Sequence, residues 1–187
     1  AVFYQVFGKV EIKIAGTWEK ASVGAVIPEG ATISTGFSSK AVISIQNNVL
    51  EVKQLTRLTL KELLEKEQTV STDLYLSVGK IGANVKSSAG RRQTFRISSP
   101  VSTAAVRGTI FEYDGYTLTV EEGIVAFFNL LDQRQNVNQG DSSSTDGYDQ
   151  PFSESPGGLN QPEDFGTNDF WEGSVEEFGT LSISWDL

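Results

Sequence analysis

Carboxylates are the side chains of this sequence best suited to acid–base chemistry, because its 187 residues include no His and no Cys. Mechanisms that depend on imidazole or a thiolate, and thiolate metal sites, are therefore excluded. Four carboxylates, Glu112, Asp114, Glu121 and Glu122, lie within eleven residues of one another. A glycosidase needs two carboxylates at a set separation across a cleft, and nothing in the sequence indicates a cleft. We predict that these groups are solvated, that the chain is not an enzyme, and that it uses no cofactor.

A run of aspartates between Asp141 and Asp149 resembles a calcium loop only in composition. It lacks the D-x-[DN]-x-[DN]-G spacing and the closing glutamate of an EF-hand. We therefore predict no metal site in this segment.

One basic cluster is present, with Phe95 among its members. It consists of Lys86, Arg91, Arg92 and Arg96. Nucleic-acid binding would require a basic domain overall, whereas residues 1–131 hold 14 Lys and Arg against 12 Asp and Glu. Two interpretations stay open: a contact with an acidic partner or glycan, or a solvated loop whose arginines lie over apolar surface.

The net charge of −9 belongs to the C-terminal part of the chain, because residues 132–187 hold one Arg and 12 acidic residues. Residues 133–168 are rich in Gln, Asn, Asp, Ser, Gly and Pro, and they have too few apolar side chains to offset their ordering entropy. We predict a folded domain over 1–131, a flexible acidic linker over 132–168 and a C-terminal segment over 169–187. No apolar run approaches the ~20 residues of a membrane-spanning helix.

Leu181, Ile183 and Trp185 alternate with polar residues, which predicts a strand at the C-terminus. An isolated strand leaves its backbone groups unpaired. We therefore expect this strand to dock onto a sheet edge of the core or of a partner, with Trp185 as a candidate partner-binding residue.

A β-hairpin is predicted around Asp114-Gly115, a dipeptide typical of a two-residue type I′ turn. This turn would pair Tyr113 with Tyr116. Period-two alternation then predicts one buried face. Its members are Thr109, Phe111, Tyr113, Tyr116, Leu118 and Val120.

Gly108 precedes the hairpin and indicates a backbone position that a side chain would obstruct, such as a bulge. Arg107 would be structural if a carboxylate or backbone carbonyls held it, and functional if it contacted a partner. We favour the structural role. The predicted structural motif consists of Arg107, Gly108, Thr109, Phe111, Asp114 and Gly115.

An internal repeat relates residues 33–60 to residues 101–128 without gaps, chiefly through the spacing of apolar residues. We therefore predict an all-β fold in which two related units bury their apolar faces together, as a duplicated roll or sandwich. A short β-solenoid is the alternative.

The order and spacing of three motifs resemble the FecR domain, which is named for a bacterial regulator of iron uptake. They are Pro100-Val101-Ser102-Thr103, then Val106-Arg107-Gly108-Thr109-x-Phe111, then Leu118-Thr119-Val120-x-Glu122-Gly123-x-Val125. The resemblance extends more loosely from about Gly8 to about Phe128.

The resemblance implies an extracytoplasmic, periplasmic or secreted protein that binds a protein partner in a signal relay or another envelope assembly. The alternative that we retain is a carbohydrate- or cell-wall-binding module, in which exposed Trp and Tyr would stack on sugars.

Overall fold

Alternating burial shapes the strands of the computed structural model, which describes residues 1–66, 69–87 and 92–154. In β12 (Thr109–Tyr113), every second residue is buried, and the residues between are half-buried. Because successive side chains of a strand point to opposite faces, such a strand presents one face to a core. The described residues form seventeen strands and no helix, and so contain no helix that could cross a membrane.

The strands form two sheets. Sheet A has the order β1 (Val2–Phe7), β5 (Lys40–Ile45), β6 (Asn48–Val52), β9 (Ile81–Val85), β12, β13 (Thr117–Glu122), β16 (Ser142–Ser144) and β17 (Phe152–Glu154). Sheet B has the order β15 (Arg134–Asn138), β14 (Ile124–Asn129), β11 (Ser102–Val106), β10 (Arg92–Ser98), β8 (Thr69–Val78), β7 (Arg57–Lys66), β4 (Thr32–Thr35), β2 (Val10–Ile14) and β3 (Thr17–Lys20).

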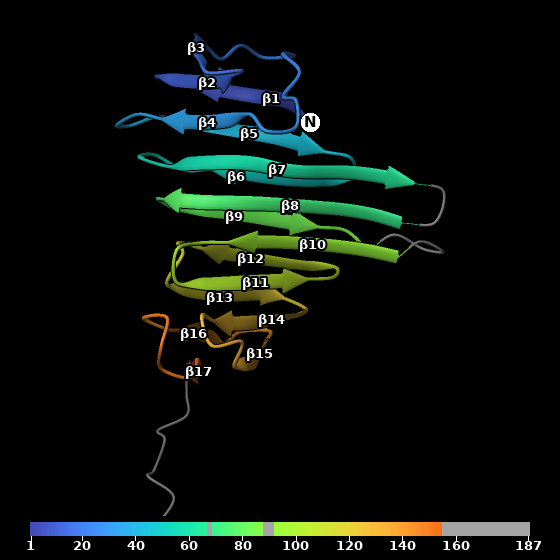
Figure 1. Ribbon diagram of the computed structural model, residues 1–187, viewed down its shortest axis with the longest axis vertical. Helices are drawn as coiled ribbons and strands as arrows, with labels where there is room; N and C mark the ends of the chain where they lie inside the picture. Colours follow the sequence, from blue (N-terminus) through green and yellow to red (C-terminus); the bar gives the residue numbers. More distant parts are fainter. Residues whose placement is uncertain (67–68, 88–91, 155–187) are drawn as a thin grey trace, which may run out of the picture. The chain divides into compact units, whose positions relative to one another are not determined.

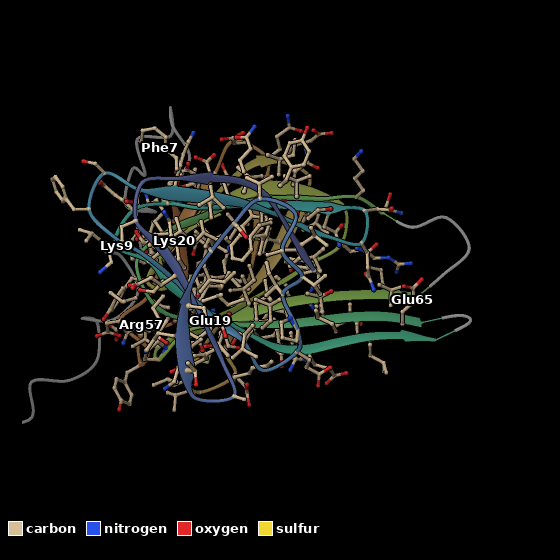
Figure 2. The ribbon with its side chains drawn as sticks, turned by 90° about the horizontal axis from the view of Figure 1, so that it is seen from above. Phe7, Lys9, Glu19, Lys20, Arg57 and Glu65 are labelled. Carbon is tan, nitrogen blue, oxygen red and sulfur yellow. The ribbon has the colours of Figure 1, made fainter. Side chains whose placement is uncertain are left out.

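The two sheets lie face to face, with their apolar side chains between them (Figure 1, Figure 2). Neighbouring strands are antiparallel except β8 and β10, which are parallel. A β-solenoid would stack its successive coils in parallel. The structure is thus the predicted all-β, two-sheet fold and not the solenoid alternative.

The predicted repeat is present in the order of the strands but not in their directions. The strands β4 to β7 and β11 to β14 each contribute to sheets B, A, A and B in turn. However, β5 and β12 run in opposite directions, because β5, β6, β9 and β12 are antiparallel in succession. The two units thus have the same order of strands within each sheet, but corresponding strands run in opposite directions. Two units related in this way are mirror images in their topology. No rotation superposes the two units in this correspondence, and what they share is the burial pattern.

The hairpin of β12 and β13 has the predicted buried face but a longer turn. Tyr113 pairs with Leu118, not with Tyr116. The Asp114 carboxylate accepts the backbone N–H of Thr117 at 2.8 Å, and Gly115 has a φ of +95°. This side-chain bond favours a four-residue turn. The register shifts by two residues, so every predicted core position keeps its face except Tyr116, which is exposed.

The linker prediction is corrected for residues 134–154, which belong to the sheets. There β15 pairs with β14, β16 with β13, and β17 with β16. Val137 is fully buried, and Ser143 is nearly so. The reason is that a polar segment satisfies its backbone groups on an existing edge strand without needing an apolar face of its own. Residues 155–168 of the predicted linker and the C-terminal segment, including Trp185, lie outside the described residues.

Tyr113 makes the stability of the fold sensitive to alkaline pH. Its hydroxyl is buried and lies 2.7 Å from the Ser102 Oγ. Burial raises the pKa of the Tyr113 phenol, and the hydrogen bond from Ser102 opposes this in part. The unfolded pKa is about 10. Because the folded pKa lies above it, the stabilisation is complete below about pH 10 and is lost as the pH rises through the folded pKa.

We therefore expect urea midpoints of the wild type to fall above about pH 10. Tyr113→Phe removes the titrating group and should show a shallower decline in urea titrations over the same pH range. Parallel declines for the two proteins would contradict this assignment.

Candidate partner-binding site

Two glycines of the FecR-like motifs meet at one end of the sandwich. Gly108 lies in the turn between β11 and β12, and Gly123 lies between β13 and β14. Their φ angles are +72° and +88°. A Cβ at Gly123 would lie 2.8 Å from the Gly108 carbonyl oxygen. Such closeness excludes a side chain, so the spacing of the two motifs reflects the contact of two turns.

Gly108 also contacts the segment that follows β9. A Cβ at this position would lie 3.1 Å from the Ser87 Cβ. A side chain would therefore be crowded at position 108, which occupies a turn with positive φ and not a strand bulge.

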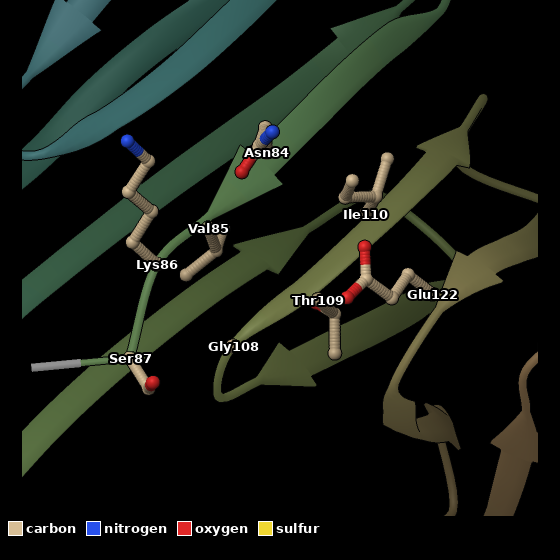
Figure 3. A pocket seen from close by; sticks show the side chains of 8 residues that line it. All are labelled: Asn84, Val85, Lys86, Ser87, Gly108, Thr109, Ile110 and Glu122. Carbon is tan, nitrogen blue, oxygen red and sulfur yellow. The ribbon is translucent and has the colours of Figure 1, made fainter.

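A depression of about 290 Å³ lies beside these turns (Figure 3). Its lining comes from the end of β9, from the turn before β12 and from the end of β13. The lining residues are Asn84, Val85, Lys86, Ser87, Gly108, Thr109, Ile110 and Glu122. Lys86, which follows β9, and Glu122, the last residue of β13, are both exposed, so the depression carries both signs of charge. The Thr109 Oγ1 is buried and has no hydrogen-bond partner among the described residues.

Lys86 owes its place to a residue of the first half of the chain. The buried Asn48 accepts the backbone N–H of Lys86 through its Oδ1 at 3.0 Å. The side chain of Gln93 donates to the same Oδ1 at 3.4 Å. Asn48 was not predicted as a site residue, because nothing local links it to a segment 38 residues further along the chain.

Arginines surround a second groove, of about 340 Å³, on the outer face of sheet B. Ala105 and Ala126 are opposite each other in β11 and β14, and they form its floor. Arg107 and Arg134 line the groove, and Arg96 is the register partner of Ala105. All three arginines are exposed. The two small floor residues thus leave a hollow with guanidinium groups around it.

We expected a carboxylate or backbone carbonyls to hold the Arg107 side chain, and the described residues provide no such contact. It is exposed, and over residues 1–66, 69–87 and 92–154 the structure has no hydrogen bond or ion pair of its side chain. The carboxylate or carbonyl group that would make it structural is absent from this part of the chain. Arg107 therefore contributes an exposed cation to the lining of the second groove.

The other predicted site residues have different positions. Arg92 is the first residue of β10, and Arg91 lies outside the described residues. Phe111 is a core residue. Asp114 and Gly115 form the turn at the opposite end of β12 from Gly108, so they belong to the hairpin and not to this site.

One carboxylate of the hairpin, Glu112, has structural partners. Glu112 forms an ion pair with Lys53 and lies 3.7 Å from the Lys80 Nζ. The hydrogen bond from Lys53 lowers the pKa of the Glu112 carboxyl, an effect that burial partly opposes. Glu112 is therefore an ionised surface group at neutral pH, a state that does not suit a general acid.

Asp146, in the segment compared above with a calcium loop, accepts the backbone N–H groups of Tyr148 and Asp149 at 2.9 and 3.1 Å. These two hydrogen bonds lower the pKa of Asp146. In the parts of the chain that the structure covers, no three Asp or Glu residues are grouped closely enough to hold a metal ion.

The fold and these turns define a two-sheet all-β domain of the FecR class. Residues 31–126 match the FecR protein family, which is more than half of the chain. The chain belongs to this family. The matched range runs from the residue before β4 into β14 and includes both turns with the motif glycines.

The fold also resembles solved structures. Two crystal structures of a proposed anti-sigma factor from Parabacteroides distasonis superpose with TM-scores of 0.55 and 0.54 at 12% sequence identity. The alignment covers 66% of this chain and 59% of the other. The chain thus matches somewhat more than half of the length of that protein. No curated protein matches the sequence.

Proposed function

We propose that this chain is a non-enzymatic, extracytoplasmic FecR domain that binds a protein partner in a signal relay of the cell envelope. The observation that carries the proposal is the family membership over residues 31–126. The fold shared with a proposed anti-sigma factor is consistent with it.

The surface at the motif turns suits such a contact. Lys86, Arg96 and Arg107 are exposed cations, and the described chain has no hydrogen bond or ion pair of their side chains. The buried Thr109 hydroxyl beside them lacks a partner as well. A buried polar group without a hydrogen bond is costly, which favours a group of the partner that reaches it. We propose a partner that presents carboxylates to the cations.

The carbohydrate alternative would need a row of exposed aromatic rings on one sheet. On sheet B, Lys13 and Arg57 each lie 5.9 Å from the Trp18 ring centroid, and Lys61 lies 4.5 Å from that of Tyr75. Three strands separate β3, which carries Trp18, from β8, which carries Tyr75. Rings so far apart and already covered by cations do not favour stacking on consecutive sugars.

Site-specific photo-cross-linking in cells tests the proposal. A cross-linking residue replaces Lys86 in the full chain, and the control replaces Lys20, which is likewise an exposed lysine but belongs to β3. We expect one adduct with an envelope protein from position 86 and none from position 20. Arg107→Ala should lower the adduct about tenfold, the usual effect of losing a charged hydrogen bond.

Thr109→Val separates binding from folding, because it keeps the side-chain shape and removes only the hydroxyl. We expect a weaker adduct with an unchanged or higher thermal midpoint. Equal adducts at positions 86 and 20, or no adduct at either, would contradict the proposed surface.

A further inference from the structure

Four turns at one end of the sandwich each expose an apolar side chain. Phe7 ends β1, Phe37 lies between β4 and β5, Leu55 between β6 and β7, and Val78 ends β8. Their exposed fractions are 64%, 78%, 55% and 59%, in this order. The antiparallel pairs of β1 with β5, of β4 with β7 and of β7 with β8 place these turns at the same end, on the left of Figure 1. We call these four residues the apolar turn edge.

Hydrogen bonds hold the turns side by side. The backbone N–H of Leu55 donates to the carbonyl oxygen of Gly36 at 3.2 Å. The Thr35 hydroxyl accepts the N–H of Thr56 at 2.9 Å, and the Thr56 hydroxyl accepts the N–H of Lys80 at 3.0 Å. Both threonines are buried. The apolar side chains are therefore presented on a fixed framework.

Leu55 is strained as well as exposed. Its φ is +55°, in the left-handed region that bulky side chains avoid. A glycine would relieve this strain, and an exposed leucine contributes little to the core. A residue whose backbone is strained and whose apolar side chain lies outside the core indicates a role in contacts outside the domain.

Cations predominate around the apolar turn edge. They are Lys9, Lys40, Lys53, Arg57 and Lys80, and the carboxylates among them are Glu11, Glu51 and Glu112. Lys9, Lys40 and Lys53 each pair with one of these glutamates, which leaves an excess of two positive charges. A hollow of about 260 Å³ beside Phe7 includes Lys40 and Lys53 together with Glu51 in its lining.

We infer that the apolar turn edge inserts into the surface of an anionic phospholipid bilayer. Its side chains project from turns, Phe7 also borders the hollow described above, and cations lie near them in the adjoining strands and turns. This arrangement matches a bilayer surface, where the apolar groups enter the acyl boundary and the cations meet anionic headgroups. The inference does not depend on the proposed partner site. Lys80 precedes the start of β9 and Lys86 follows its end, so the two surfaces lie at opposite ends of the strands.

Vesicle co-sedimentation of the full chain tests the inference. The vesicles contain equal parts of phosphatidylcholine and phosphatidylglycerol, with pure phosphatidylcholine as the reference. We expect the wild type to bind the anionic vesicles and to dissociate in high salt. The double variant Phe37→Asp, Leu55→Asp should bind at least about tenfold more weakly, because two buried apolar groups are lost. The matched control is Val23→Asp, Val26→Asp, which alters two valines of similar exposure away from these turns and should bind as the wild type does.

Leu55→Gly distinguishes a lipid contact from a structural role. It should raise the thermal midpoint by relieving the positive φ, and it should still weaken vesicle binding. Failure of the wild type to bind anionic vesicles at low salt would overturn the inference, as would equal losses in the two double variants. Self-association in sedimentation equilibrium that only Phe37→Asp, Leu55→Asp abolishes, without vesicle binding, would assign the edge to a second copy of the chain instead.

Discussion

Gly123→Ala is expected to lower the free energy of unfolding by about 3 kcal/mol, the largest effect of a single methyl group at the motif turns. The new Cβ would lie 2.8 Å from the Gly108 carbonyl oxygen and 2.8 Å from the Thr109 Cγ2. The first is a backbone atom, and the second belongs to a stiff β-branched side chain, so neither moves cheaply. The positive φ of Gly123 adds backbone strain.

Gly140→Ala is the matched control for this prediction. Gly140 has nearly the same φ, +85°, but an added Cβ there meets nothing within 4 Å. Its cost should be the backbone term alone, about 1–2 kcal/mol. Urea unfolding of both variants measures the difference. Equal losses would show that the contact between the two motif turns contributes nothing, which would remove the structural reason for their spacing.

Asn129→Ala should cost about 3 kcal/mol and release the segment that follows β16. The side chain of Asn129 is buried at the end of β14. Its Nδ2 donates to the Gln133 Oε1 at 2.7 Å and to the Asp149 carbonyl oxygen at 3.1 Å. Its Oδ1 accepts the N–H groups of Leu131 and Gln133 at 3.0 and 2.9 Å. Removing the amide leaves several of these groups without a partner in a water-poor site.

Asn136→Ala is the control, because Asn136 is exposed and its side chain accepts only the Arg134 Nε–H at 3.0 Å among the hydrogen bonds described. It should change stability by less than about 0.5 kcal/mol. Limited proteolysis with mass spectrometry is the second measurement. In Asn129→Ala, the first cuts should move into residues 145–150, and in Asn136→Ala they should not. An unchanged cleavage pattern in both variants would show that Asn129 does not hold this segment.

The local pattern of the sequence was sufficient for the buried faces. Phe111 and Val120 lie inside because alternation assigns faces by parity, and a register shift of two residues leaves parity unchanged. Because of the same register shift, the prediction of a two-residue turn was wrong. Asp114-Gly115 is typical of a two-residue turn, but the Asp114 carboxylate binds a backbone N–H three residues further on.

The candidate site was predictable only in part. Gly108 was recognisable as a required glycine from its motif, and Lys86 from its charge. Nothing in the sequence shows that Gly108 packs against Gly123, or that Asn48 holds the backbone of Lys86. Both contacts depend on which strands become neighbours in a sheet, and the packing of the whole core determines which strands are neighbours. The same is true of Arg107, for which the sequence does not show that the described residues provide no anchor.

The sequence by itself determined the all-β class, the buried face of the hairpin strands β12 and β13 and the FecR motifs, because period-two burial and turn chemistry are local properties. The tertiary structure alone decided the opposed directions of the two units and the inclusion of residues 134–154 in the sheets. The physical reason is that backbone hydrogen bonds do not depend on side-chain type. A polar segment with no apolar face becomes a strand when an edge strand offers unpaired N–H and C=O groups beside it.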